Sequence, residues 1–167
     1  MQTGVLVPHV RSADEAVLLA RLAHYGPGGR GYAGSTRAAD YGLSAIPNHL
    51  ASSVRRTTVI AQIEDAEALE RIDAIAEVEG IDALFVGRID LAISLGCTTP
   101  DDPRVVKAVE AIVAACQRAG RAVGMFLSRT SDVPHWREQG ASLFLLSSDH
   151  NFIRSGALAM RSDAGLA

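Results

Sequence analysis

The sequence has few cysteines and no long apolar run, and both shortages exclude classes of protein. Cys97 and Cys116 are the two cysteines among 167 residues, and they do not form a CxxC pair. A disulfide framework needs more cysteines, so we expect a reducing, cytoplasmic compartment. No apolar stretch reaches the ~18 residues of a membrane-spanning helix, and no basic-then-apolar leader opens the chain. We therefore expect no association with a membrane.

Positive charge is not clustered. Lysine is almost absent, arginine carries most of the positive charge, and the formal net charge is −3. Because no group of Lys and Arg residues forms a basic face, nucleic acid is not an expected partner. What is present is an ordinary globular composition, with 48% hydrophobic and 21% charged residues. The length suits one domain with a sizeable core.

Short apolar runs alternate with amphipathic stretches along the whole chain. The runs predict buried strands, and the stretches with helical spacing predict helices. The predicted strands are 4–10, 57–63, 81–86, 122–127 and 141–146, and the predicted helices are 13–23, 47–54, 66–78, 103–119, 131–139 and 151–160.

Strands that are apolar along their whole length and alternate with helices indicate an α/β protein with a parallel sheet. Such a sheet is covered on both faces or closed into a barrel. Five units in this chain give roughly 33 residues each, against about 31 in a (β/α)₈ barrel of ~250 residues. A five-stranded doubly wound sheet fits the same period, so the periodicity leaves both architectures open.

Two carboxylates follow consecutive predicted strands. In either architecture ligands bind at the C-terminal ends of parallel strands, which is where Glu64 and Asp90 stand. Neighbouring strands lie ~4.8 Å apart, so both side chains can reach one point. A hard cation such as Mg²⁺ takes one or two carboxylates and leaves its other positions to water or substrate. By spacing alone, a simpler interpretation is favoured, in which each carboxylate caps the helix that follows it.

A resemblance to a known family changes that balance. Its most specific part is VIAQIEDAEAL (59–69) followed by VEGIDALFVGRIDL (78–91). These segments resemble the HpcH/HpaI aldolase and citrate lyase family, where the pattern is roughly QIETxxA and then VEGVDGVFIGPxDLS. The match continues through 4–16, 26–37 and 140–144, so it covers nearly the whole chain.

The resemblance implies a (β/α)₈ TIM barrel of the phosphoenolpyruvate/pyruvate type. Residues 1–167 would then form a single partial barrel domain without the first three βα units. The implied activity is that of a metal-dependent class II aldolase, a carbon–carbon lyase that cleaves or forms 4-hydroxy-2-oxo acids through a pyruvate enolate. Mg²⁺, Mn²⁺ or Co²⁺ would stabilise the charge on oxygen. The small-molecule partners would be a 2-oxo acid and an aldehyde.

The resemblance also implies roles for particular residues. Glu64 and Asp90 would bind the metal. Gln62 would contact the 2-oxo acid, and the backbone N–H groups of Ile89 and Asp90 would hold its carboxylate. The loop at Ser35 would approach the substrate. The acid–base His and the polarising Arg of such aldolases lie on strands without a counterpart here, so the catalytic group is unknown.

Two residues depart from the family or stand outside its known roles. Arg88 stands where the family usually has Pro. It is either a cation beside the substrate carboxylate or an exposed loop residue, and we expect the exposed loop residue. His9 follows a strand, but it matches a position without a catalytic role in the family.

Three functions stay open from the sequence. Besides the aldolase, the same metal pair would serve a citrate lyase β-subunit-like acyl-CoA lyase, and the absent strands favour a truncated, non-catalytic barrel fragment. A five-unit fragment leaves two unpaired barrel edges, so we expect association with copies of itself, as a homo-oligomer, or with a missing N-terminal portion.

Overall fold

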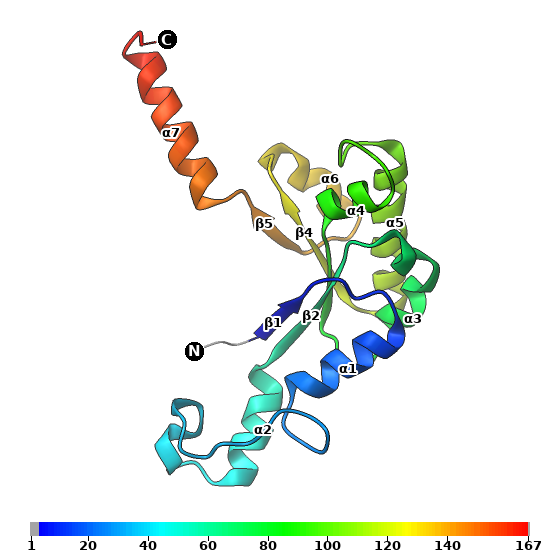
Figure 1. Ribbon diagram of the computed structural model, residues 1–167, viewed down its shortest axis with the longest axis vertical. Helices are drawn as coiled ribbons and strands as arrows, with labels where there is room; N and C mark the ends of the chain where they lie inside the picture. The colour runs from blue at the N-terminus through cyan, green and yellow to red at the C-terminus, as the bar shows by residue number, and fades with distance from the viewer. Residues whose placement is uncertain (1–3, 167) are drawn as a thin grey trace.

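A parallel sheet and its connecting helices make up the fold (Figure 1). The computed structural model describes residues 4–166. The strands are β1 (Gly4–Val7), β2 (Thr58–Ile63), β3 (Ala83–Val86), β4 (Ala122–Leu127) and β5 (Leu143–Leu146). The α-helices are α1 (Ala13–Ala23), α2 (Ile46–Arg56), α3 (Ile72–Ala76), α4 (Arg88–Ser94), α5 (Pro103–Ala119), α6 (Val133–Glu138) and α7 (Asp149–Asp163), and the 3₁₀ helices are η1 (Arg37–Gly42), η2 (Ala66–Arg71) and η3 (Thr130–Asp132).

The order of the strands decides between the two predicted architectures. Each strand pairs in parallel with the next strand in the chain, so the sheet runs β1-β2-β3-β4-β5. A doubly wound sheet reverses its order at a switch point. Residues 4–166 contain no such reversal, and they form a parallel α/β half-barrel. In this part of the chain, the outer edges of β1 and β5 have no strand partner.

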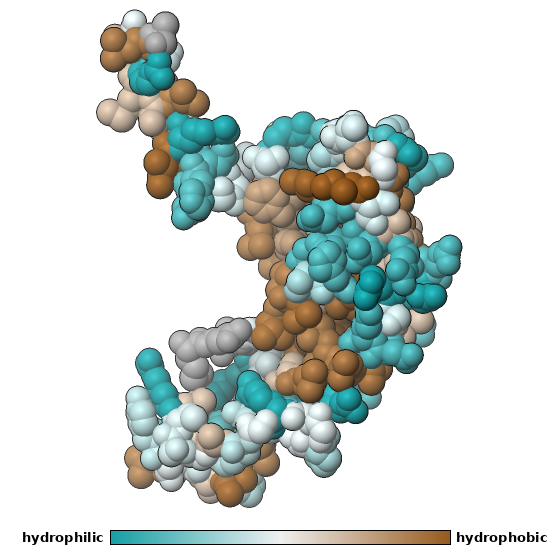
Figure 2. All heavy atoms as spheres, viewed as in Figure 1, coloured by the Kyte–Doolittle hydropathy of each residue, from teal (hydrophilic) through white to brown (hydrophobic). Residues whose placement is uncertain are grey.

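The helices cover one face of the sheet. Figure 1 shows α1, α3, α4, α5 and α6 on the same side of the strands. On the opposite side the described residues leave a hollow, which Figure 2 shows lined with hydrophobic atoms. Leu6 and Leu145 lie on this concave face and are 38% and 50% exposed. Within residues 4–166 this face is uncovered and the sheet is not closed, which is consistent with the predicted partial barrel.

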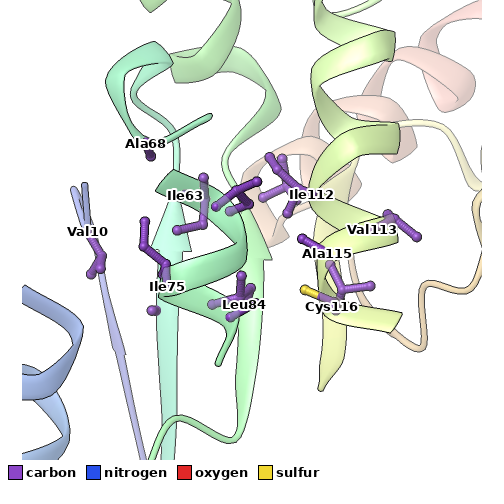
Figure 3. Packing of buried hydrophobic residues seen from close by; sticks show 14 of the residues in the cluster. Val10, Ile63, Ala68, Ile75, Leu84, Ile112, Val113, Ala115 and Cys116 are labelled. Carbon is purple, nitrogen blue, oxygen red and sulfur yellow. The ribbon is translucent and has the colours of Figure 1, made fainter. Parts of the chain in front are cut away.

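The core lies between the strands and the helices. Ile63 of β2, Leu84 of β3, Ile75 of α3 and Ile112 of α5 are fully buried and meet in this layer (Figure 3). Full burial of such a side chain stabilises the fold by about 1.5–3 kcal/mol. Because the core lies against β2 and β3, it fixes the positions of the residues that follow these strands.

Helix α5 matches its predicted bounds because both of its ends carry strong local signals. The Asp102 side chain accepts a hydrogen bond from the Arg104 N–H at 2.9 Å, and Pro103 occupies the first helical position. At the other end Gly120 adopts the left-handed conformation (φ 65°). Its N–H bonds to the Cys116 carbonyl, which ends the helix.

The helical segments that follow β2 and β3 differ from the sequence prediction. The predicted helix 66–78 is divided into η2 and α3, since Arg71 has non-helical angles (φ −121°, ψ 13°). Helix α4 was not predicted, because its seven residues are too few to show a helical period.

Helix α7 projects from the sheet (Figure 1), and none of its residues is buried. Ser148 caps it by accepting a hydrogen bond from the Asn151 N–H at 3.3 Å. Among residues 4–166, no helix combines the length and the apolar character needed to cross a membrane.

Candidate active site

Glu64 lies at the carboxyl end of β2 and faces the hollow. Side chains alternate along a strand. Val59, Ala61 and Ile63 are buried on the helix side, so Gln62 and Glu64 share the concave side. The Glu64 residue is only 3% exposed. Its Oε1 accepts the backbone N–H of His9 at 3.1 Å, and its Oε2 accepts Nε2–H of Gln62. A desolvated carboxylate is thus held in a fixed orientation.

The bonds of the Glu64 carboxylate do not cap the helix that follows it. The first N–H of η2, on Ala66, donates to Ser94 Oγ at 2.8 Å, and the Ala68 N–H donates to the Asp65 carbonyl. Helix capping by Glu64, the simpler interpretation of the sequence, therefore does not describe this residue.

Gly87 makes room for the Glu64 carboxylate. It follows β3, whose last residue Val86 pairs with Ile63 of β2, so Gly87 and Glu64 stand side by side. A Cβ atom on Gly87 would lie 2.6 Å from Glu64 Oε2, 2.9 Å from Glu64 Cβ and 3.1 Å from Gln62 Nε2. These distances are below normal contact, so a side chain at position 87 would displace Glu64. Gly87 was not predicted as a site residue, although it lies within the family pattern.

Asp90 stands in the first turn of α4, a helix that begins directly after Gly87, and its side chain is exposed. Since β2 and β3 are neighbours in register, Glu64 and Asp90 are at the same end of adjacent strands. The N–H groups of Ile89 and Asp90 belong to the first turn, where backbone N–H groups have no partner within the helix. They are free to bind an anionic group.

His9 contacts both carboxylates that follow β2. Its Nδ1 lies 3.1 Å from Asp65 Oδ2 and 3.3 Å from Glu64 Oε1. The hydrogen bond with Asp65, followed by the charge of Glu64, raises the pKa of His9 above its ordinary value. Its backbone adopts φ 58°, an uncommon angle for a residue with a side chain. Contacts across 55 and 56 residues of sequence leave no local signal, so they were not predicted.

Comparison with known proteins identifies the family. The model of the HpcH/HpaI aldolase/citrate lyase family matches residues 2–155. The chain belongs to this family. A 4-hydroxy-2-oxovalerate aldolase from Rhodococcus jostii (strain RHA1) is 36% identical over 163 residues, which cover 95% of this chain and 62% of the relative. A 5-keto-4-deoxy-D-glucarate aldolase from Citrobacter koseri is 34% identical over 152 residues, which cover 90% and 58%.

A solved structure agrees with this assignment. The crystal structure of an HpcH/HpaI aldolase/citrate lyase family protein from Burkholderia cenocepacia J2315 superposes with a TM-score of 0.87 at 31% identity. The match covers 97% of this chain and 65% of that protein. The chain thus spans between 58% and 62% of the length of the two curated relatives.

The donor set of this HpcH/HpaI family chain fits a hard divalent cation. Glu64 and Asp90 offer carboxylate oxygens, the ligands that Mg²⁺ and Mn²⁺ prefer. Within residues 4–166, no Lys or Arg forms an ion pair with the buried Glu64, and its one basic neighbour there is His9, which carries a charge when it is protonated. Across the same residues, no group of three or more His, Cys, Asp and Glu side chains could hold a metal. An ion here would fill its remaining positions with water or substrate, as Mg²⁺ commonly does.

Ser35 is not brought to Glu64 within one chain. Its loop packs with α2 near Thr57, just before β2 begins, whereas Glu64 follows the last residue of β2. At 3.3 Å per residue, the two ends are about 20 Å apart. The approach of Ser35 to the substrate stays a prediction, which residues 4–166 of one chain do not themselves meet.

Arg88 is buried, and the expectation of an exposed loop residue is wrong. Only 8% of it is exposed. Its Nη2 donates to the Pro100 carbonyl at 3.0 Å and to Asp101 Oδ1 at 3.3 Å, and its guanidinium lies 5.2 Å from the ring centre of Trp136. Arg88 therefore ties the start of α4, and with it Asp90, to the segment before α5.

Proposed function

We propose that this chain supplies the metal- and 2-oxo-acid-binding part of a divalent-metal-dependent class II aldolase. Such an enzyme cleaves or forms 4-hydroxy-2-oxo acids. The observation that carries the proposal is Glu64, a buried carboxylate that faces the hollow beside the start of α4. The family and the aldolase names of both curated relatives support carbon–carbon lyase chemistry.

Each residue has a distinct task in this proposal. Glu64 and Asp90 hold Mg²⁺, Mn²⁺ or Co²⁺, which when bound offsets the negative charge that develops on the substrate oxygen. Gln62 gives one amide N–H to Glu64 and keeps the other for the 2-oxo acid. The N–H groups of Ile89 and Asp90 bind the substrate carboxylate at the positive end of α4.

Metal binding tests the two ligands directly. We expect saturable Mn²⁺ binding in isothermal titration calorimetry, weakened strongly by Glu64→Gln and by Asp90→Asn. Glu110→Gln is the matched control, since this exposed carboxylate on α5 loses the same charge away from the site. Unchanged Mn²⁺ affinity in either site variant would remove that residue from the site. Equal losses in the control would show that overall charge alone matters.

Substrate binding and turnover separate the possible functions. Positioned acid–base groups contribute typically 10²–10⁴-fold to a rate, and the resemblance places that group on strands without a counterpart here. We therefore expect the chain to bind pyruvate or oxalate only with Mg²⁺ or Mn²⁺ present, and to cleave 4-hydroxy-2-oxo acids slowly or not at all. If a completed barrel also binds pyruvate without cleaving 4-hydroxy-2-oxo acids, the result would favour the non-catalytic function. Activity that requires a CoA thioester would favour the acyl-CoA lyase.

A completed barrel provides the positive arm of this test. The five described units joined to three further βα units should cleave 4-hydroxy-2-oxo acids, and EDTA should abolish the cleavage. The location expected from the sequence, the cytoplasm, and the homo-oligomeric state stay predictions.

A further inference from the structure

A pocket lies at the opposite end of β2 from Glu64. The loop after α1 and one face of α2 enclose it, and we call it the α2 pocket. Its lining includes Tyr25, Arg30, Thr36, His49, Ser53 and Arg56. No residue of the candidate active site contributes to it.

The chain around the α2 pocket is positively charged, although the protein as a whole carries −3. Between residues 24 and 57 the sequence has four arginines and a single acid, Asp40. The described lining of the pocket contains no carboxylate. A concave site with cations and no acid raises the local concentration of anions.

Both arginines of the pocket keep free donors. The guanidinium of Arg30 stacks over the ring of Tyr25, 4.0 Å from its centre. This contact uses the face of the guanidinium and leaves its edge N–H groups unused. Arg56 donates Nε–H to the Ser52 carbonyl at 3.3 Å, which leaves its terminal N–H groups. Neither arginine forms an ion pair with a carboxylate in the part of the chain that the structure describes.

One face of α2 carries further donors toward the same space. His49, Ser53 and Arg56 recur at helical spacing and all line the pocket. His49 is only 2% exposed, and its Nδ1 lies 3.3 Å from the hydroxyl of Tyr32. That contact fixes the ring and leaves Nε2 for a ligand. Ser53 is also buried and adds a hydroxyl.

We propose that the α2 pocket binds a phosphate-type dianion, either free phosphate or the phosphoryl group of a small metabolite. Two arginines, an imidazole and a hydroxyl line the same pocket, which suits a tetrahedral anion with several acceptor oxygens. A carboxylate, by contrast, needs only one arginine, which binds it through two parallel hydrogen bonds. The site is independent of the proposed aldolase function.

Calorimetric titration with inorganic phosphate tests the proposal. EDTA and constant ionic strength exclude metal and bulk-salt effects. Wild-type protein should bind one phosphate per chain, and Arg30→Gln and Arg56→Gln should each weaken binding about tenfold or more, because hydrogen bonds to charged groups contribute this much. Arg55→Gln is the matched control: it removes the same charge from the neighbouring position of α2 but does not line the pocket. It should change the affinity by no more than about twofold.

The remaining arms identify the ligand and guard against misfolding. Tighter binding of glycerol phosphate than of phosphate would identify a metabolite's phosphoryl group, and equal binding would identify free phosphate. Arg56→Lys, which keeps the charge, should retain more affinity than Arg56→Gln, and circular dichroism should show both folded. Glu64→Gln should bind phosphate normally, which separates this site from the aldolase proposal. Lack of saturable binding, equal losses in Arg55→Gln, or equal competition by pyruvate would overturn the proposal.

Discussion

Replacement of Gly87 by alanine tests whether the position of the Glu64 carboxylate, and not only its charge, determines metal binding. The new Cβ would lie 2.6 Å from Glu64 Oε2 and 2.9 Å from Glu64 Cβ. The flexible end of the Glu64 side chain can rotate away, but its Cβ is attached to the backbone directly after β2 and cannot. We therefore expect overpacking to cost about 1–3 kcal/mol of unfolding free energy. Displacing the carboxylate should weaken Mn²⁺ binding by about 10–100-fold, as for other residues that orient metal ligands.

The assay pairs calorimetric Mn²⁺ titration with urea unfolding of the same preparations. Gly156→Ala is the matched control, because a Cβ at this exposed position of α7 meets no atom within 4 Å. It should leave Mn²⁺ affinity unchanged and stabilise the helix slightly, by about 0.5–1 kcal/mol. Wild-type Mn²⁺ affinity in a folded Gly87→Ala protein would refute the argument that Gly87 sets the place of Glu64.

Three further predictions concern other parts of the molecule. Burial raises the pKa of Cys116 to about 12 from an ordinary 9.0, so the contribution of the buried thiol to folding stability should be complete below pH 9 and decline toward pH 12. A thiol reagent should modify Cys116 at pH 8 only after unfolding. Hydrogen bonds from Arg104 lower the pKa of Asp102 to about 2 from 3.8, so the stability that this helix cap contributes should be present above about pH 4 and lost as the pH falls toward 2. In urea unfolding at a series of pH values, Asp102→Ala should remove this loss of stability between pH 4 and pH 2. The uncovered α7 should support association in light scattering, weakened by Ile153→Asp but not by Ser155→Asp; a monomer in the wild type would contradict this.

The sequence predicted those elements whose ends carry local signals. Helix α5 has its cap at Asp102, its proline at the first position and a glycine in the left-handed conformation after its end, so its bounds follow from the sequence. Helix α4 has only seven residues and no side-chain cap. The start of η2 depends on Ser94 of α4, whose hydroxyl accepts the first N–H of η2 from 28 residues further along the chain. Tertiary contacts of this kind have no signature in a local pattern.

The candidate site was predicted by resemblance more than by pattern. Spacing alone favoured helix capping for Glu64, and only the family pattern selected it as a ligand together with Asp90. The contacts of His9 with Glu64 and Asp65 join segments 55 and 56 residues apart and depend on the register of β1 and β2. Burial of Arg88 was not predicted because its partners, Pro100 and Asp101, lie after the end of α4, 12 and 13 residues along the chain.

The two ends of β2 carry groups of opposite charge, the Glu64 carboxylate after the strand and the Arg56 guanidinium before it. The length of the strand keeps the two groups apart within one half-barrel. The six residues of β2 place Glu64 about 20 Å from Arg56. This is more than twice the Debye length of about 8 Å at physiological salt. Glu64 and Arg56 share no hydrogen-bond or ion-pair partner among residues 4–166, and substitutions more than about 7–10 Å apart without a shared partner usually act independently. Substitutions at the two ends should therefore act additively. A Glu64→Gln/Arg56→Gln double variant should lose Mn²⁺ and phosphate binding by the same factors as the single variants, and a deviation beyond about twofold would show that the two sites communicate through the sheet.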